Sequence, residues 1–302
     1  MALRKFDEGL YYEGEMELEY RIRMNSLVGY IHEHLDEPLP LETLVRVANF
    51  SPFHLHRIFT AFIGMPMGEY IRRLRLRRAV HSLATTRIPV TTIALEAGYD
   101  SPAAFSKAFR QAFGMSPIEA RKLRKEYQPF KNFQTGTRRS VLMKPEIRTY
   151  PTRRIAMVTR KGMLNRNFND AADRAFSKLC SYMDAHKLWK HVHECLGICP
   201  DDPDEVTLAE ARYIGAFIID DDTPIQPDGD LELGTIPGGR FAVFMHRGPF
   251  EALNDTWTAV YRDWLPASGV QLRDSDPFEV YLDDKSKTKP EDLRTEIYIP
   301  IK

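Results

Sequence analysis

The spacing of apolar residues changes character about halfway along the chain. Up to Lys125, apolar positions recur every three to four residues, which is the spacing of amphipathic helices. Farther on, short runs resemble strands, with helical stretches at about 168–186 and 250–264. The strand-like runs are Ile155–Thr159, Tyr213–Ile219, Arg240–His246, Phe278–Leu282 and Glu296–Ile299.

These patterns predict a multidomain chain. The first half is expected to be all-α. The second half mixes strands with two helices and predicts an antiparallel sheet covered on one side, an α+β domain. The stretch between them is polar, with Gln128-Pro129 and Thr135-Gly136-Thr137, and reads as a linker. The predicted parts are an N-terminal extension (1–20), a helical domain (21–126), a linker (127–144) and the α+β domain (145–302).

The helical half contains an internal repeat. Several residues recur 50 positions later: Ser51-Pro52, Phe59, Gly64-Met65 and Glu69 as Ser101-Pro102, Phe109, Gly114-Met115 and Glu119. Three residues upstream recur 49 positions later: Leu44, Ala48 and Phe50 as Ile93, Ala97 and Tyr99. A recurring pattern predicts a recurring structural unit, with a turn one residue longer in the second copy.

Each copy predicts a helix, a tight turn and a second helix. Ser51 is a good N-cap in the first copy, and Asp100 or Ser101 in the second. Gly98 can adopt the positive φ that a tight turn needs. Between the copies, Gly68 to Leu83 predicts a long helix with an apolar stripe of Ile71, Leu74 and Val80. Its arginines are Arg72, Arg73, Arg75, Arg77 and Arg78. Taken alone, such a run is a solvated face; between two groove-sized motifs it favours contact with DNA.

This region resembles the DNA-binding domain of the AraC/XylS family over about residues 24–125. The match is carried by Ile31 to Leu35 with Pro38-Leu39, Ala48 to Phe59, Gly64 to Leu76, Ile93-Ala94 with Ala97 to Tyr99, and Phe105 to Arg121. The resemblance implies two helix-turn-helix units whose second helices enter successive major grooves.

The outward residues of the second helices are the predicted DNA contacts. They are Ser51, Phe53, His54, His56, Arg57 and Thr60 in the first unit, and Ser106, Lys107 and Arg110 in the second. By position in the family motif, Phe53, His56 and Arg57 match base-contacting residues, and arginine can bond guanine at two atoms. We therefore expect the first unit to read bases and the second to hold phosphate. The alternative is that these are ordinary exposed helix side chains.

Charge and cysteine content agree with a DNA-binding first half. Residues 1–143 hold 21 Lys and Arg against 15 Asp and Glu; of the 42 of each kind, 21 and 27 remain for residues 144–302. The basic half suits a polyanion such as DNA.

No apolar run has the length of a signal peptide or a membrane span, which predicts a cytoplasmic protein. His191, His193, Cys195 and Cys199 would share one face of a strand, but their spacing is not a common zinc pattern, and neither a metal nor a cofactor is expected.

Two strands of the second half carry the same Glu-x-Tyr pair. Alternation places Glu279 and Tyr281 on one face of their strand, and Glu296 and Tyr298 on one face of the next. Such faces are either exposed to water, as one side of many antiparallel sheets is, or line a pocket. In a pocket, the rings supply area and cation–π attraction, and the carboxylate attracts a cationic ligand.

The second half resembles the GyrI-like effector-binding domain, which is found at the C-terminus of the Rob type of AraC regulator and, in related form, in MerR-type multidrug sensors. Matching segments include Arg212-Tyr213, Ile236 to Ala242, His246 to Phe250, Trp264 to Gly269, Phe278 to Leu282 and Glu296 to Ile301. The resemblance implies duplicated strand-helix-strand-strand units with a ligand cleft between them. It implies Glu279 as the pocket carboxylate, with Glu296 as a parallel candidate. The other predicted ligand-binding residues are Tyr213, Trp257, Tyr261, Tyr281 and Tyr298. Ile214 departs from the acidic residue usual in the family, which implies a more apolar ligand or a vestigial site.

The predicted function is a sequence-specific transcription regulator, interpreted as an activator, that is controlled by a small hydrophobic or cationic ligand. Its expected partners are double-stranded DNA, the ligand and RNA polymerase, with no membrane. Two alternatives stay open. In one, the second half docks a protein such as gyrase or polymerase. In the other, it hydrolyses reactive small molecules, although no nucleophile-base set supports an enzyme.

Overall fold

The chain forms two compact units in the computed structural model, which describes residues 3–5, 10–123, 144–163, 167–201, 206 and 208–302. One unit comprises Glu19–Phe50 and Phe59–Arg138. The other comprises Met1–Leu18, Ser51–Ile58 and Arg139–Lys302. The predicted linker, 127–144, lies outside the described residues except for Lys144.

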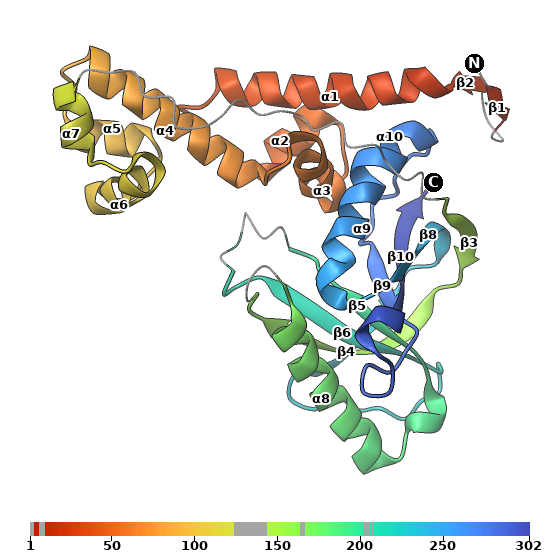
Figure 1. Cartoon of the computed structure of the whole chain (residues 1–302). Coiled ribbons are helices and arrows are strands. Elements are labelled where there is room, and N and C mark those ends of the chain that lie inside the picture. Colours follow the sequence, from red (N-terminus) through yellow and green to blue (C-terminus); the bar gives the residue numbers. More distant parts are fainter. Residues whose placement is uncertain (1–2, 6–9, 124–143, 164–166, 202–205, 207) are drawn as a thin grey trace. The chain divides into compact units, whose positions relative to one another are not determined.

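The N-terminal elements are helical apart from one short ribbon. Strands β1 (Leu3–Lys5) and β2 (Leu10–Tyr12) pair antiparallel, which the sequence did not predict. The helices are α1 (Glu13–Glu33), α2 (Leu41–Ala48), α3 (Pro52–Ile63), α4 (Met67–Thr85), α5 (Val90–Glu96), α6 (Pro102–Phe113) and α7 (Pro117–Leu123). The pairs α2–α3 and α5–α6 are the two copies of the repeat, joined by α4 (Figure 1). The predicted all-α domain with two helix-turn-helix units is confirmed.

Backbone conformation at the two turns explains their sequences. Asn49 ends α2 at a φ of 51°, a left-handed conformation that asparagine tolerates better than most residues. The corresponding turn after α5 places Gly98 at a φ of 79°. Ser101 then caps α6, because its side chain accepts a hydrogen bond from the amide of Ala104 at 3.2 Å. Both turns therefore follow from local chemistry.

Helix α4 buries one residue of the predicted apolar stripe, Val80, but not the other two. Ile71 and Leu74 are only half-buried. The fully buried residues are Met67, Tyr70, Leu76, Ala79, Val80 and Leu83. Arg75 donates to the backbone oxygens of Leu35 and Glu37, both at 3.0 Å, so it holds the chain between α1 and α2. Arg75 is therefore a structural residue, and the arginine run is not one uniform face.

The other unit is built on an eight-stranded antiparallel sheet. Its strands are β3 (Glu146–Tyr150), β4 (Arg153–Lys161), β5 (Val192–Ile198), β6 (Arg212–Ile219), β7 (Leu231–Ile236), β8 (Gly239–Arg247), β9 (Phe278–Tyr281) and β10 (Arg294–Ile301). They lie in the order β3-β8-β10-β9-β5-β6-β4-β7. Within the described residues, no helix is both long and apolar enough to span a membrane.

The strand order shows the duplication. In the first half, β4 is followed by α8 (Asn169–His186), the 3-10 turn η1 (Trp189–His191), β5 and β6. In the second half, β8 is followed by a helical segment, β9 and β10. That segment comprises η2 (Phe250–Ala252), α9 (Leu253–Ala259), the π-helical turn η3 (Val260–Trp264) and α10 (Leu265–Ser268), and the turn η4 (Pro290–Asp292) precedes β10. Strands β5 and β9 pair at the centre of the sheet. From there one half runs β5, β6, β4 and the other runs β9, β10, β8, so equivalent strands lie in the same order. The predicted duplicated unit is confirmed.

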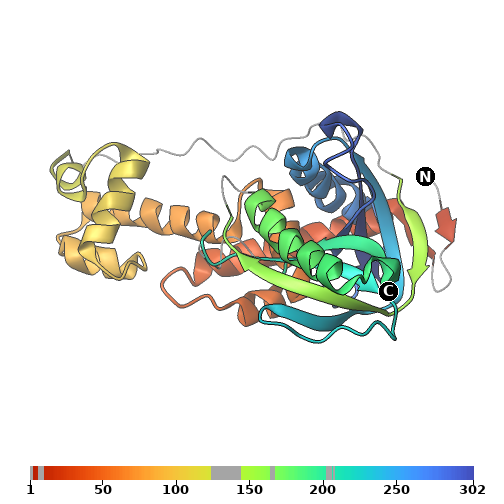
Figure 2. The same cartoon turned by 90° about the horizontal axis from the view of Figure 1, so that it is seen from below.

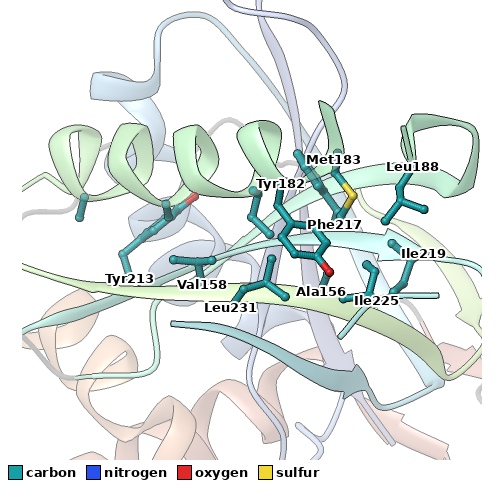
Figure 3. Close-up of a cluster of buried hydrophobic side chains, with 13 residues drawn as sticks. Ala156, Val158, Tyr182, Met183, Leu188, Tyr213, Phe217, Ile219, Ile225 and Leu231 are labelled. Carbon is teal, nitrogen blue, oxygen red and sulfur yellow. The ribbon is translucent and has the colours of Figure 1, made fainter. Parts of the chain in front are cut away.

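Both faces of this sheet carry a buried core. Helix α8 lies across one face of the first half (Figure 2), where Figure 3 shows Val158, Tyr213 and Phe217 beneath it. On the opposite face, side chains from both halves pack together, including Ile218, Phe241, Phe278 and Tyr298. The predicted helical cover lies on the face of α8, where Phe176 of α8 and Trp257 of α9 both reach strand β9, but the opposite face is buried as well. The reason is that strands from both halves bury their second apolar face against one another.

Candidate functional site

Helix α6 presents its predicted DNA contacts on its outer side. Lys107 and Arg110 are exposed and Ser106 is half-buried. The opposite side of the helix buries Phe105, Phe109 and Phe113. The second helix-turn-helix therefore offers two exposed positive charges on one rigid helix, as a phosphate contact requires.

The start of α3 is placed differently. Residues Ser51–Ile58 belong to the same compact unit as the sheet, and His54 is fully buried there. Its Nδ1 lies 2.8 Å from the hydroxyl of Tyr261, and its Nε2 lies 3.2 Å from the backbone oxygen of Arg273. Since a carbonyl can only accept, Nε2 carries the proton and Tyr261 donates to Nδ1. The Ser51 hydroxyl donates to Asp274 at 2.6 Å.

Burial and charge keep His54 neutral. Burial lowers the pKa of its imidazole to about 3, and the nearby Arg57 guanidinium acts in the same direction. The expectation that His54 points outward is not met in this structure. Phe53, His56 and Thr60 are half-buried.

Arg57 lies beside one of the predicted ligand residues. Its guanidinium carbon is 5.1 Å from the centre of the Trp257 ring, within the range of cation–π attraction. It also donates to the backbone oxygens of Cys199 and Phe53, each at 3.0 Å. These contacts all fall inside the unit that contains Ser51–Ile58.

Glu279 is the centre of a buried polar cluster. The residue is 9% exposed on strand β9. Trp257, from α9, donates its indole N–H to Oε1 at 2.6 Å, and Tyr281 donates its hydroxyl to Oε2 at 2.7 Å. Tyr213, from β6, extends this chain, since its hydroxyl lies 3.0 Å from that of Tyr281. The structure thus brings four of the predicted ligand residues together; Glu279 with Trp257, Tyr281 and Tyr213 is named the Glu279 cluster below.

Aromatic rings surround this cluster. The ring centre of Tyr281 lies 5.4 Å from that of Phe250 and 5.9 Å from that of Phe176. Trp257 stacks on Tyr261 with an interplanar angle of 14°. The carboxylate therefore sits among rings whose faces carry negative potential, an environment that suits a cation.

The charge of Glu279 is uncompensated by an ion pair. Among the described residues, no Lys, Arg or His nitrogen lies within 4.0 Å of its carboxylate. Burial raises the pKa of the Glu279 carboxyl above its usual range, while the Trp257 and Tyr281 donors and the charge of Arg57 oppose the shift. Burial likewise raises the pKa of the Tyr281 hydroxyl, which keeps it a donor.

Glu296 and Tyr298 lie on the opposite face of the sheet. In the pairing of β10 with β9, Ile297 stands opposite Glu279 and Glu296 opposite Val280. Directly opposed residues share a face, so the two Glu-x-Tyr pairs point to different sides. Glu296 was expected to line the pocket in parallel with Glu279, but the strand register places the two carboxylates on opposite faces.

Glu296 has a cationic partner. It is 7% exposed, and Arg148 donates to its Oε2 at 2.9 Å. The Tyr298 hydroxyl donates to the same oxygen at 3.0 Å. The Tyr298 ring stacks on Phe278 with an interplanar angle of 10°. Neither carboxylate faces open water, and only Glu279 is left without an ion pair within the described structure.

Two residues that contact these carboxylate clusters were not predicted from the sequence. Gly197 on β5 stands opposite Glu279, and a Cβ there would clash with the hydroxyls of both Tyr213 and Tyr281. Arg148 on β3 meets Glu296 on β10 across the one intervening strand, β8. A glycine inside an apolar strand pattern was a signal for close approach at Gly197. No local signal existed for Arg148, because its partner is far along the chain.

Family comparisons agree with both regions. The model of the GyrI-like small molecule binding domain matches residues 143–302, more than half of the chain. The chain belongs to this family. A helix-turn-helix domain model matches residues 44–123.

Similar proteins match either nearly the whole chain or one part of it. Over 298 residues the chain is 26% identical to the right origin-binding protein of Escherichia coli K12, covering 92% of this chain and 98% of that protein. It is 36% identical over 98 residues to the regulatory protein SoxS of Salmonella typhimurium, covering 32% of this chain and 92% of SoxS. The solved C-terminal domain of EcmrR has a TM-score of 0.42 and 16% identity, covering 54% of this chain and 99% of that domain. This GyrI-like chain is an AraC-type, DNA-binding transcription regulator with a small-molecule-binding domain.

Proposed function

We propose that this regulator binds a cationic aromatic small molecule at the Glu279 cluster, and that the bound molecule changes its occupancy of DNA. The single observation that carries the proposal is the buried, unpaired carboxylate of Glu279 among aromatic rings. Glu296 already has a compensating cation in Arg148. Glu279 has none among the described residues, so a cationic ligand would supply the missing positive charge.

The energetics favour a cation over a neutral or anionic molecule. An ionised carboxylate in a buried site costs free energy unless a positive charge compensates it. A delocalised cation gains from the carboxylate and from the ring faces, and it loses less hydration than a compact ammonium. Tyr213 and Tyr281 would orient the ligand through their hydroxyls, with Tyr261 behind Trp257.

Arg57 supplies a route from ligand to DNA. It contacts the Trp257 ring, and it is also the residue predicted to bond guanine. A ligand cation that stacks on Trp257 competes with Arg57 for the same ring. Binding of the ligand and freedom of Arg57 are then coupled, and the coupling acts in both directions.

The DNA-binding part of the proposal divides labour between α3 and α6. Phe53, His56 and Arg57 read bases, and Lys107 and Arg110 hold phosphate, with Ser51, Thr60 and Ser106 supporting them; the buried His54 is not part of this surface. Arg57→Ala should weaken binding to the cognate operator by about 10-fold or more and leave random DNA nearly unchanged. Lys107→Ala should weaken both to a similar degree and lower the salt dependence. Equal losses from both variants on both DNAs would refute this division.

The ligand part is tested with tetraphenylphosphonium, a cation shielded by phenyl rings. Calorimetry with the full chain should show one site whose affinity falls at least about 30-fold in Glu279→Gln. Glu296→Gln is the matched control, because it removes the same charge from the neighbouring strand, and it should change affinity less than about 3-fold. Fluorescence anisotropy with labelled operator should then show a ligand-dependent shift in the wild type and in Glu296→Gln, but not in Glu279→Gln. Equal losses in both variants would place the site elsewhere.

The proposal describes a regulator without catalytic activity that acts in the cytoplasm, where its DNA is, and that activates transcription through contact with RNA polymerase. Cys199 is the cysteine nearest to Glu279 in electrostatic terms and is therefore the thiol to consider as a nucleophile, but burial raises its pKa to about 12. A thiol that stays protonated at neutral pH is a poor nucleophile.

A further inference from the structure

A second cluster of ligating side chains lies at one end of strands β5 and β6, away from the Glu279 cluster. His191 directly precedes β5 and His193 is its second residue. Asp220 directly follows β6, whose last residue, Ile219, pairs with Val192. Because the strands are antiparallel neighbours, the start of one and the end of the other meet. Two imidazoles and a short acidic turn therefore come together.

Both imidazoles converge on one carboxylate. His191 Nδ1 lies 2.9 Å from Asp220 Oδ2, and His193 Nε2 lies 2.6 Å from Asp220 Oδ1. Asp222 joins the group, since ligand atoms of His191, Asp220 and Asp222 all lie within 4.8 Å of one another. The side chains of Asp220 and His193 are 39% and 43% exposed, so an ion from solvent can reach them.

We propose that His191, His193, Asp220 and Asp222 bind one divalent transition-metal ion, with Zn²⁺ as the best match. Imidazole nitrogens with carboxylate oxygens are a donor set for zinc, whereas magnesium and calcium prefer oxygen alone. Neighbouring ligand atoms of a tetrahedral zinc site lie about 3.4 Å apart. The ligand atoms of His191, Asp220 and Asp222 lie within 4.8 Å of one another, so no pair among them needs to close by more than about 1.4 Å. The two histidine–Asp220 pairs, at 2.9 and 2.6 Å, would open by less than about 1 Å as the metal replaces their hydrogen bonds.

The backbone around these ligands is held in place. Arg154 donates to the carbonyl oxygens of Asp221 at 2.7 Å and Thr223 at 2.9 Å. The Thr223 hydroxyl donates to the carbonyl oxygen of Asp220 at 2.8 Å. These bonds fix the turn through its main chain and leave the carboxylates of Asp220 and Asp222 for an ion. Fixed ligands lower the ordering cost of binding a metal.

The two nearby cysteines do not belong to the site. The pairing of β5 with β6 shifts register between Val192 and Glu194. Consequently Val192, Cys195 and Cys199 all pack against the core beneath α8, although strict alternation would separate the first from the other two. The sequence expectation of two histidines and two cysteines on one face is thus not met.

Calorimetry of the full-length protein with Zn²⁺ alone tests this site. We expect one site per chain, with affinity at least about 10-fold weaker in Asp222→Asn. The neighbouring Asp221→Asn removes the same charge outside the ligand group, and we expect it to change affinity less than about 2-fold. His191→Gln with His193→Gln should abolish the site, and a thermal melt should show that this protein still folds.

Three outcomes would overturn the proposal. The first is that the wild type binds no Zn²⁺ at 100 μM, which would mean a dissociation constant weaker than about 100 μM. The second is an equal loss in Asp221→Asn and Asp222→Asn. The third is loss of binding in Cys195→Ser or Cys199→Ser with the histidine variant unaffected. Tetraphenylphosphonium binding is measured on the same variants and should be unchanged, so failure here is distinct from failure at Glu279.

Discussion

The two Glu-x-Tyr pairs of the sheet have the same sequence pattern and opposite electrostatic situations. Glu279 accepts hydrogen bonds from neutral donors, Trp257 and Tyr281, whereas Glu296 is paired with Arg148. Both carboxylates are buried to a similar extent. Burial therefore does not distinguish a binding site from a structural ion pair. The presence or absence of a compensating charge does, and the following predictions probe that difference.

The largest loss of stability is expected from a substitution at Gly197, which stands opposite Glu279 on strand β5. Gly197→Ala places a methyl group against the hydroxyls of Tyr213 and Tyr281, and both must move. We expect a loss of about 3 kcal/mol in the free energy of unfolding, measured with urea. Gly234→Ala on β7 is the control, because its Cβ would meet mainly the flexible end of Met157. Its cost should stay below about 1 kcal/mol. Similar losses in both would contradict the close-approach role of Gly197.

Removing the partner of Glu296 should cost less. Arg148→Met leaves a buried carboxylate without its cation, but the Arg148 side chain is 34% exposed, so water compensates in part. We expect a loss of about 1–2 kcal/mol in unfolding free energy. Adding Glu296→Gln to Arg148→Met should recover most of that loss. A double-mutant cycle with no coupling would refute the pair as a stabilising unit.

Neutralising Glu279 should raise the free energy of unfolding, the opposite of the effect expected for Arg148→Met. Burial raises the pKa of the Glu279 carboxyl in the folded state above its usual value of 4.5. Between the pKa of the unfolded chain and that of the folded protein, the unfolded chain therefore binds fewer protons than the folded protein. Stability then falls as pH rises through that window. Glu279→Gln should stabilise the ligand-free protein by about 1 kcal/mol at neutral pH. The gain should vanish towards pH 4.5, which thermal melts across pH would reveal. A Glu279→Gln protein less stable than wild type at every pH would contradict an uncompensated carboxylate.

The smallest difference concerns the two tyrosines. Tyr281→Phe removes one of two donors to Glu279 and should cost about 1 kcal/mol in unfolding free energy. Tyr298→Phe should cost about half as much, because Arg148 still satisfies Glu296. Both are measured by urea unfolding at pH 7, and a larger loss in Tyr298→Phe would reverse the proposed order.

Much of the helical region was predictable because its signals are local. The repeat identified both helix-turn-helix units, and Gly98 and Ser101 marked the turn and cap of the second. The exposure of Lys107 and Arg110 also followed from helical spacing. The burial of His54 did not, because its partners Tyr261 and Arg273 lie more than 200 positions away.

The sequence by itself determined the two helix-turn-helix units, five of the eight strands of the sheet (β4, β6, β8, β9 and β10), and which side chains share a face within one strand. It placed Glu279 with Tyr281 and Glu296 with Tyr298, and both pairings hold. Only the tertiary structure decided that the two pairs face opposite sides, that Arg148 compensates one of them, and that His191 meets Asp220. The physical reason is that alternation along a strand is a local property. The register between strands, and hence which charges meet, depends on residues far apart in the chain.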